Sequence, residues 1–206
     1  MAIKFAIFDI GQVCYSYTLE YLNCYLREQS NNCEVFDGHN GVYTFNYNPF
    51  MRGECSFSQF CEEVCAYCDV DYTKDKEIFI NDTMHQGVGK FYDETLIAMQ
   101  NLKKNSVRLA LLSNALPNLR DVKISFVEKK YMFFSFNLGL LKPDKVIYKT
   151  VLKELGVQAK EVIFIDDKKR NTDAAESVGI KSIVFNEKTI VTDIQKIIEI
   201  SKGDDS

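Results

Sequence analysis

Acidic and polar side chains follow three short apolar runs of the sequence, and their types suit phosphoryl-transfer chemistry. Asp9 ends the run "FAIFD". Ser113 and Asn114 end "LALLSN", and the pair Asp166–Asp167 ends "VIFIDD". A carboxylate at such a point can act as a nucleophile, and paired carboxylates bind hard cations such as Mg²⁺. Lys142, in "LLKPDK", adds a positive charge. Together these groups supply a nucleophile, a hydroxyl donor, a lysine and a metal-binding pair.

A parallel sheet is the element that would bring these side chains together. Short continuous apolar runs, typical of strands buried on both faces, occupy residues 4–9, 107–114, 132–138, 161–167 and 181–185. Helical spacing separates them at residues 93–105, 117–130, 144–156 and 171–179. Repeated strand–helix units predict an α/β fold with a doubly wound, Rossmann-like parallel sheet. Such sheets bind ligands at the carboxyl ends of their strands, where the three polar sets should meet.

Several residues mark the ends of the predicted helices. Asp93 is expected to cap the helix over 93–105 at its N-terminus, and Pro117 suits the first position of the next helix. Gly156 and Gly179 are expected to close the helices that precede them.

Residues 15–88 differ from the rest in composition. They hold 12 acidic and 4 basic residues, six of the seven cysteines, and 14 of the 26 Phe and Tyr residues. Helices are predicted over 19–28, 57–68 and 74–84, the second with a capping box between Ser56 and Gln59. We therefore expect a catalytic core of residues 1–14 and 89–206, with residues 15–88 inserted as a small helical cap.

The overall composition narrows the class of protein. With 206 residues, 46% hydrophobic and 26% charged, an ordinary globular core is expected, and the net charge of −4 argues against a nucleic-acid partner. The sequence has no apolar run near the ~20 residues of a membrane span and begins without a signal-peptide layout. We expect a cytoplasmic protein with buried free thiols, without a nucleic-acid or membrane partner. The sequence does not decide between monomer and homodimer.

Four motifs, taken together, resemble a known family. "FDIGQV", "LLSNA", "LKPDKVIY" and "FIDDKKRNTDAAESVGI" follow one another in the order and spacing of the haloacid dehalogenase superfamily of hydrolases. The resemblance covers the whole chain and is to the phosphatase branch with a helical cap. Within it, "FDIGQV" and "MRGECSFSQF" are most similar to bacterial phosphatases that act on glucose 1-phosphate and similar sugar phosphates.

The resemblance implies roles for the matching residues at a metal site. Asp9 would attack phosphorus and become a transient aspartyl phosphate. A divalent cation, Mg²⁺, would be held by the Asp9 side chain, the Gly11 carbonyl and Asp166. Asp167 would be a further ligand or would support the ligands, and Asn171 would orient the acidic pair.

The resemblance also implies how substrate is held. Ser113 would donate a hydrogen bond to the transferring phosphoryl group, with help from the Asn114 backbone. Lys142 would neutralise charge on the phosphate and the nucleophile. Tyr15, Arg52 and His85 are candidate substrate contacts from the cap or its hinge.

Gly11 departs from the family pattern, because many members carry an aspartate there that protonates the leaving group and later activates water. Loss of a general acid typically slows a reaction ~10²–10⁴-fold. The main prediction is a Mg²⁺-dependent phosphatase of small phosphorylated metabolites, with sugar phosphates as candidate substrates. Two alternatives stay open: a slowed or non-catalytic protein that binds a phosphorylated ligand, and a metal-free 2-haloacid dehalogenase.

Overall fold

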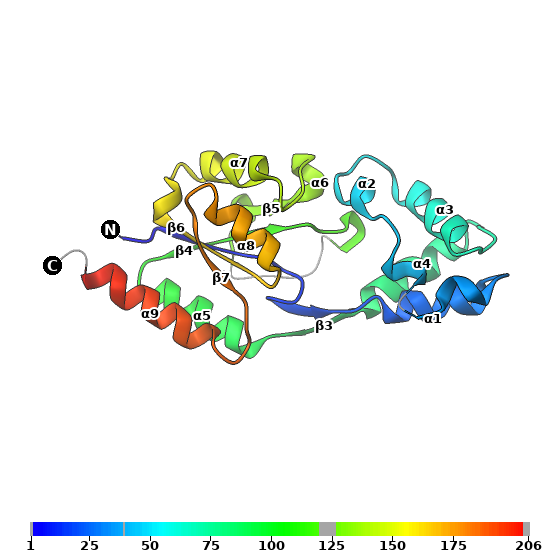
Figure 1. The fold of residues 1–206 in the computed structure, drawn as a ribbon, viewed down its shortest axis with the longest axis horizontal. Helices are drawn as coiled ribbons and strands as arrows, with labels where there is room; N and C mark the ends of the chain where they lie inside the picture. The colour runs from blue at the N-terminus through cyan, green and yellow to red at the C-terminus, as the bar shows by residue number, and fades with distance from the viewer. Residues whose placement is uncertain (1, 39, 120–126, 204–206) are drawn as a thin grey trace.

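The computed structural model describes residues 2–38, 40–119 and 127–203, and its centre is a five-stranded parallel sheet (Figure 1). The strands lie in the order β5-β4-β1-β6-β7 and comprise β1 (Phe5–Phe8), β4 (Arg108–Ser113), β5 (Met132–Phe134), β6 (Val162–Asp166) and β7 (Lys181–Val184). Every neighbouring pair is parallel. The chain starts in the central strand and winds outward to both sides, which confirms the predicted doubly wound α/β fold.

Helices cover both faces of the sheet. Ala6 and Phe8 of β1 belong to the cluster that packs against α5 (Asp93–Lys104) and α9 (Ile190–Gly203). Phe5 and Ile7 belong to the opposite cluster, with α7 (Lys145–Leu155) and α8 (Lys169–Glu176). Figure 1 shows the two pairs of helices on opposite sides of the strands. Because both faces of the sheet are buried, the strands appear in the sequence as continuous apolar runs.

Two of the predicted elements are shorter than expected. The run 132–138 is a strand only to Phe134, because Ser135–Leu138 turns into the short helix α6, which ends at Gly139 with φ +67°. Pro117 begins a 3₁₀ helix, Pro117–Leu119, instead of a long α-helix. Residues 120–126 of that predicted helix lie outside the described residues, and the described part that follows forms a 3₁₀ helix at Lys129–Tyr131.

The predicted helix ends need smaller corrections. Tyr92, not Asp93, is the N-cap of α5, and Asp93 is the first helical residue, where its charge suits the helix dipole. Gly156 closes α7 in the left-handed conformation, as predicted. The helix α8 ends at Glu176, so Gly179, with φ +89°, lies in the turn after the helix rather than at its cap.

A two-stranded antiparallel ribbon joins the sheet to the second part of the chain. It pairs β2 (Tyr15–Tyr17) with β3 (Val88–Phe91), which lie where the sequence analysis put the boundaries of the cap. Figure 1 shows the ribbon leading from the sheet to a separate group of helices. The domain boundaries at residues 14/15 and 88/89 stay a prediction, because the ribbon that connects the two parts lies at these positions.

The group of helices between β2 and β3 has its own hydrophobic cluster. It contains α1 (Glu20–Gln29), α2 (Asn48–Met51), α3 (Phe57–Tyr67), α4 (Lys76–Gln86) and 3₁₀ helices at Cys33–Phe36 and Gly41–Tyr43. The three helices predicted here agree with α1, α3 and α4 to within two residues at each end. The Ser56–Gln59 capping box is present, with both of its hydrogen bonds.

The cysteines are free thiols in this structure, and their burial differs. Cys61, Cys65 and Cys68 are fully buried in the cap cluster, which indicates a packing role. Cys24 and Cys33 are exposed, although we expected buried thiols.

The described helices include none with the length and apolar character needed to cross a membrane.

A methyl group at Gly87 tests the connection between the ribbon and α4. The backbones of Thr18 and Gly87 lie close together, because Thr18 N donates to Gly87 O across 2.9 Å. A Cβ atom at Gly87 would lie 2.1 Å from the Thr18 carbonyl oxygen. Gly87→Ala should therefore lower the free energy of unfolding by about 1–3 kcal/mol. For a chain of this size, each kcal/mol corresponds to roughly 2–4 °C in Tm. Gly11→Ala is the control, because its Cβ would meet nothing within 4 Å. Equal Tm values for the two variants would contradict this account.

Candidate active site

Polar residues from three adjacent strands meet at the carboxyl edge of the sheet. Asp9 directly follows the central strand β1, Ser113 ends β4, and Asp166 ends β6 on the other side of β1. All three are buried. This is the point where the strand order reverses direction, and the chain connections on the two sides leave a crevice for ligands.

The Lys142 ammonium group connects two of these strands. Its Nζ lies 2.9 Å from Asp9 Oδ1 and 2.6 Å from Asp166 Oδ2, and it donates to the Leu112 carbonyl oxygen across 2.9 Å. Lys142 is buried, and burial alone would lower its pKa. The charges of Asp9 and Asp166 outweigh that effect and raise the pKa of Lys142, so the lysine carries its positive charge.

The loop that carries Lys142 is held by the neighbouring strand. Asn114 forms two hydrogen bonds to the backbone of Lys142: its Oδ1 accepts from the amide N–H and its Nδ2 donates to the carbonyl, each across 2.9 Å. This role of the Asn114 side chain was not predicted. The sequence analysis assigned a role only to the Asn114 backbone, at the phosphoryl group.

Asp166 is held in one orientation by its own strand end and by α8. Its Oδ1 accepts from the Lys168 backbone N–H at 2.9 Å and from Asn171 Nδ2 at 2.8 Å. The Tyr148 hydroxyl donates to the Asn171 carbonyl oxygen across 2.8 Å, which ties α7 to the start of α8. The contact between Asn171 and Asp166 has the geometry expected of an orienting residue.

Three carboxylates gather where a cation could bind. Oxygen atoms of Asp9, Asp166 and Asp167 lie within 4.8 Å of one another. Lys142 balances only one of these three negative charges. Burial, together with the nearby Asp9 and Asp166 carboxylates, raises the pKa of Asp167, and Lys168 opposes this in part. Asp167 Oδ1 is buried without a hydrogen-bond partner among the described residues. An oxygen-only donor set with excess negative charge fits a hard divalent cation such as Mg²⁺.

Gly11 follows Asp9 by two residues and lines the same cavity. Its φ lies outside the left-handed region, and a Cβ atom would meet nothing within 4 Å. Neither the backbone conformation nor the surrounding described atoms require glycine at this position.

A cavity of about 530 Å³ lies between the sheet edge and the cap. Of the predicted residues, it is lined by Asp9, Gly11, Tyr15, Ser113, Asn114, Lys142 and Asn171. The other predicted site residues, Asp166, Asp167, Arg52 and His85, are not among the described residues that line it. The His85 ring lies 2.8 Å from the Asn81 carbonyl oxygen, on the exposed side of α4. A substrate contact of Arg52 or His85 stays a prediction.

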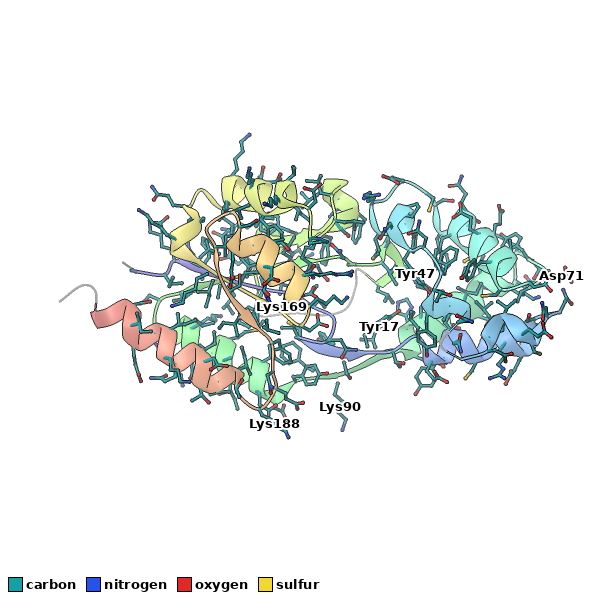
Figure 2. All side chains as sticks on the ribbon, in the orientation of Figure 1. Tyr17, Tyr47, Asp71, Lys90, Lys169 and Lys188 are labelled. Carbon is teal, nitrogen blue, oxygen red and sulfur yellow. The ribbon has the colours of Figure 1, made fainter. Side chains whose placement is uncertain are left out.

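Other residues of the cavity were not singled out as site residues. Lys168 and Arg170 line the cavity. In the sequence, the only indication of this was that the basic run 168–170 directly follows the acidic pair Asp166–Asp167. Tyr17, Tyr43 and Tyr47 line the cavity from the cap side. Figure 2 shows Tyr17 and Tyr47 in the region between the sheet and the cap helices. The aromatic composition of residues 15–88 indicated these rings as a group but did not identify them.

The chain is similar to known hydrolases. A family model described as haloacid dehalogenase-like hydrolase matches residues 56–185. A HAD family enzyme from Bacteroides thetaiotaomicron, solved with magnesium and inorganic phosphate, superposes with a TM-score of 0.70 at 20% identity, covering 90% of this chain and 96% of the other. At this identity, the superposition shows a common fold.

Two curated relatives are phosphatases. The sesquiterpene phosphatase astK of Aspergillus oryzae is 33% identical over 86 residues, covering 40% of this chain and 44% of the relative. The enolase-phosphatase E1 of Thioalkalivibrio sulfidiphilus is 28% identical over 106 residues, covering 48% of this chain and 46% of the relative. The chain thus spans less than half of the length of these relatives.

Replacing Lys142 by methionine tests the buried ion pairs. The variant leaves two buried carboxylates without their shared positive charge, and breaking a buried pair in this way costs about 3–5 kcal/mol. We expect a clearly lower denaturant midpoint for Lys142→Met in metal-free buffer. The control is Lys169→Met, which removes the exposed lysine that pairs with Asp173 across 2.6 Å (Figure 2) and should leave the midpoint close to wild type. Comparable midpoints for the two variants would show that Lys142 does not hold the site together.

Proposed function

The chain belongs to the haloacid dehalogenase-like hydrolase family, and we propose that it is a Mg²⁺-dependent phosphatase of small phosphorylated metabolites. The observation that carries the proposal is the buried contact of Lys142 with both Asp9 and Asp166 at the switch point of the sheet. A nucleophile, a positive charge and a metal-binding carboxylate then lie within reach of one phosphoryl group.

In the proposed reaction, an Asp9 oxygen attacks phosphorus and the ester oxygen leaves with its electron pair. The aspartyl phosphate is then hydrolysed by water, which returns the Asp9 carboxylate and releases inorganic phosphate. Lys142 stabilises the negative charge that develops on the phosphoryl oxygens, and Ser113 donates a hydrogen bond to one of them. When bound, Mg²⁺ would be held by Asp9, Asp166 and the Gly11 carbonyl and would supply further positive charge to the phosphoryl group.

Supporting residues have roles in this proposal as well. Asn171 keeps Asp166 oriented through its hydrogen bond, and the Asn114 side chain keeps the Lys142 loop against β4. Asp167 would add negative charge beside a bound cation and would complete or support its ligand set. Tyr15 contributes to the wall of the cavity beside these groups.

Both curated relatives described above are named as phosphatases. Their names support the reaction type, but they do not point to one substrate. Their names refer to different compounds, and the motifs resemble those of sugar phosphatases. Sugar phosphates are therefore the first candidates to test. The three carboxylates at the site favour the metal-dependent reaction over a metal-free dehalogenase.

Release of inorganic phosphate from a panel of sugar phosphates and an aryl phosphate tests the proposal. We expect release with Mg²⁺ and little with a chelator. Asp9→Asn should lower the rate by roughly 10⁴-fold or more, since the nucleophile is lost. The control is Asp173→Asn, an exposed acid of α8 outside the acidic cluster, which should keep the wild-type rate.

Three results would argue against this function. Wild-type turnover by Asp9→Asn would remove Asp9 from the reaction. Chloride release from a 2-haloacid without Mg²⁺ would identify a dehalogenase. No phosphate release from any compound, with Tm still rising on addition of Mg²⁺, would indicate a slowed or non-catalytic site that binds the metal.

Gly11→Asp tests whether a missing general acid limits the reaction. Its Cβ has space, and the new carboxyl group would lie beside Asp9 at the cavity wall. We expect rates for alkyl phosphates, which have poor leaving groups, to rise by up to ~10²–10⁴-fold. An aryl phosphate, whose leaving group needs less help from a proton, should gain less. Gly11→Asn is the matched control, because it adds a similar volume without a transferable proton. Equal effects of both substitutions would exclude a proton-transfer role.

A further inference from the structure

The cavity has a charged end and an uncharged end. Its charged lining residues, Asp9, Lys142, Lys168 and Arg170, all come from the carboxyl edge of the sheet and the start of α8. The described lining residues from the cap and ribbon are uncharged, namely Tyr15, Ser16, Tyr17, Thr18, Leu19, Tyr43, Tyr47, Met51 and Val88. This absence of charge is notable because residues 15–88 as a whole contain 12 acidic residues.

Apolar residues of the core complete the uncharged end. Leu116 and Leu119, which follow β4, line the cavity and pack with the cap cluster. Ile10 and Phe134 also line the cavity. A phosphoryl group at Asp9 would thus have hydrocarbon and aromatic surface from both parts of the chain beside it.

Three hydroxyl groups at this end of the cavity already have partners within the protein. The Tyr47 hydroxyl donates to the Val42 carbonyl oxygen across 3.0 Å, and the Tyr43 hydroxyl donates to Glu20. The Thr18 hydroxyl accepts from the Glu20 backbone N–H across 3.1 Å. Tyr17 differs, since its buried hydroxyl has no hydrogen-bond partner among the described residues.

The cap is held against the core beside this end of the cavity. Ser135 Oγ donates to the Met51 carbonyl oxygen across 2.6 Å, and Asn118 Nδ2 donates to Asn81 Oδ1 across 3.1 Å. A leaving group placed here would lie between two surfaces that contact each other. A sugar would bury several hydroxyl groups with few partners, and each buried polar group without a partner costs binding free energy.

We propose that the substrate is a phosphate monoester whose leaving group is uncharged and mainly hydrocarbon, and that this group binds against Tyr17, Met51 and Leu116. The cavity volume of about 530 Å³ falls within the range of small-molecule sites. The inference rests on the proposed phosphatase activity and narrows it to a substrate class different from the sugar phosphates that the motifs suggest. The Tyr17 hydroxyl provides one hydrogen bond for an oxygen of that leaving group.

A series of para-n-alkylphenyl phosphates, from methyl to hexyl, tests the inference. Lengthening the alkyl chain adds apolar surface and hardly changes the acidity of the phenol, so the chemistry of the leaving group stays constant. Burial of a methylene group contributes about 0.8 kcal/mol, which corresponds to a factor of about four. We expect kcat/KM to rise roughly two- to fourfold for each methylene group until the cavity is filled, and to exceed kcat/KM for glucose 1-phosphate.

Acetyl phosphate, a small activated substrate, separates the two ways in which the test can fail. If acetyl phosphate is hydrolysed but kcat/KM is flat along the alkyl series, the apolar site is wrong and the phosphatase proposal stands. If neither acetyl phosphate nor any aryl phosphate is hydrolysed with Mg²⁺, the phosphatase proposal and this inference are both wrong. A higher kcat/KM for glucose 1-phosphate than for the hexyl compound would also overturn the inference.

Met51→Gln locates the effect in the cavity. Glutamine has a similar length but places an amide where the alkyl chain would pack, so kcat/KM for the hexyl compound should fall about tenfold and the dependence on chain length should flatten. Ile78→Gln is the matched control, because Ile78 is 64% exposed on α4 and does not line the cavity. It should keep the wild-type dependence. Leu119→Gln provides a second test of the same wall, and steep chain-length dependence in both cavity variants would contradict the placement.

Discussion

The buried ammonium group of Lys142 is the interaction on which the candidate site depends. It contacts carboxylates that follow two different strands, β1 and β6, and a carbonyl of a third, β4. Because a buried charge is stable only when it is paired and hydrogen-bonded, the strand ends and the Lys142 loop must all be positioned correctly at once. Two asparagine side chains serve this requirement. Asn114 holds the backbone of Lys142, and Asn171 holds its partner Asp166.

The same charges explain why the site is suited to anionic substrates that bind with a cation. Lys142 balances one of three carboxylates, and Asp167 retains an oxygen without a described partner. A divalent cation would compensate the remaining negative charge, and cation and lysine together would attract a phosphoryl group. The acidic cluster and the lysine are thus best understood as one electrostatic unit rather than as separate residues with separate tasks.

The cap adds a surface of the opposite character. Its overall composition is acidic, yet the described residues that it contributes to the cavity are uncharged, and several are aromatic. In the proposed function, this division places the phosphoryl chemistry at the sheet edge and leaves recognition of the leaving group to the ribbon and the helices. Gly11 also lines this cavity, and neither its backbone conformation nor the described atoms around it require a glycine.

Local patterns in the sequence determined the fold class, the three main cap helices and the motifs around Asp9, Ser113, Lys142 and Asp166. These features depend on apolar periodicity, capping residues and strand-end polarity, which are properties of neighbouring residues. The short helix α6, the 3₁₀ turn at Pro117 and the ribbon β2–β3 depend on contacts with distant segments and were not foreseen. The exclusion of Arg52 and His85 from the cavity wall and the inclusion of Tyr17, Tyr47 and Met51 were also decided only by the tertiary structure. The physical reason is that the lining of a cavity between two packed parts is set by how their surfaces meet, and no local pattern in the chain records that arrangement.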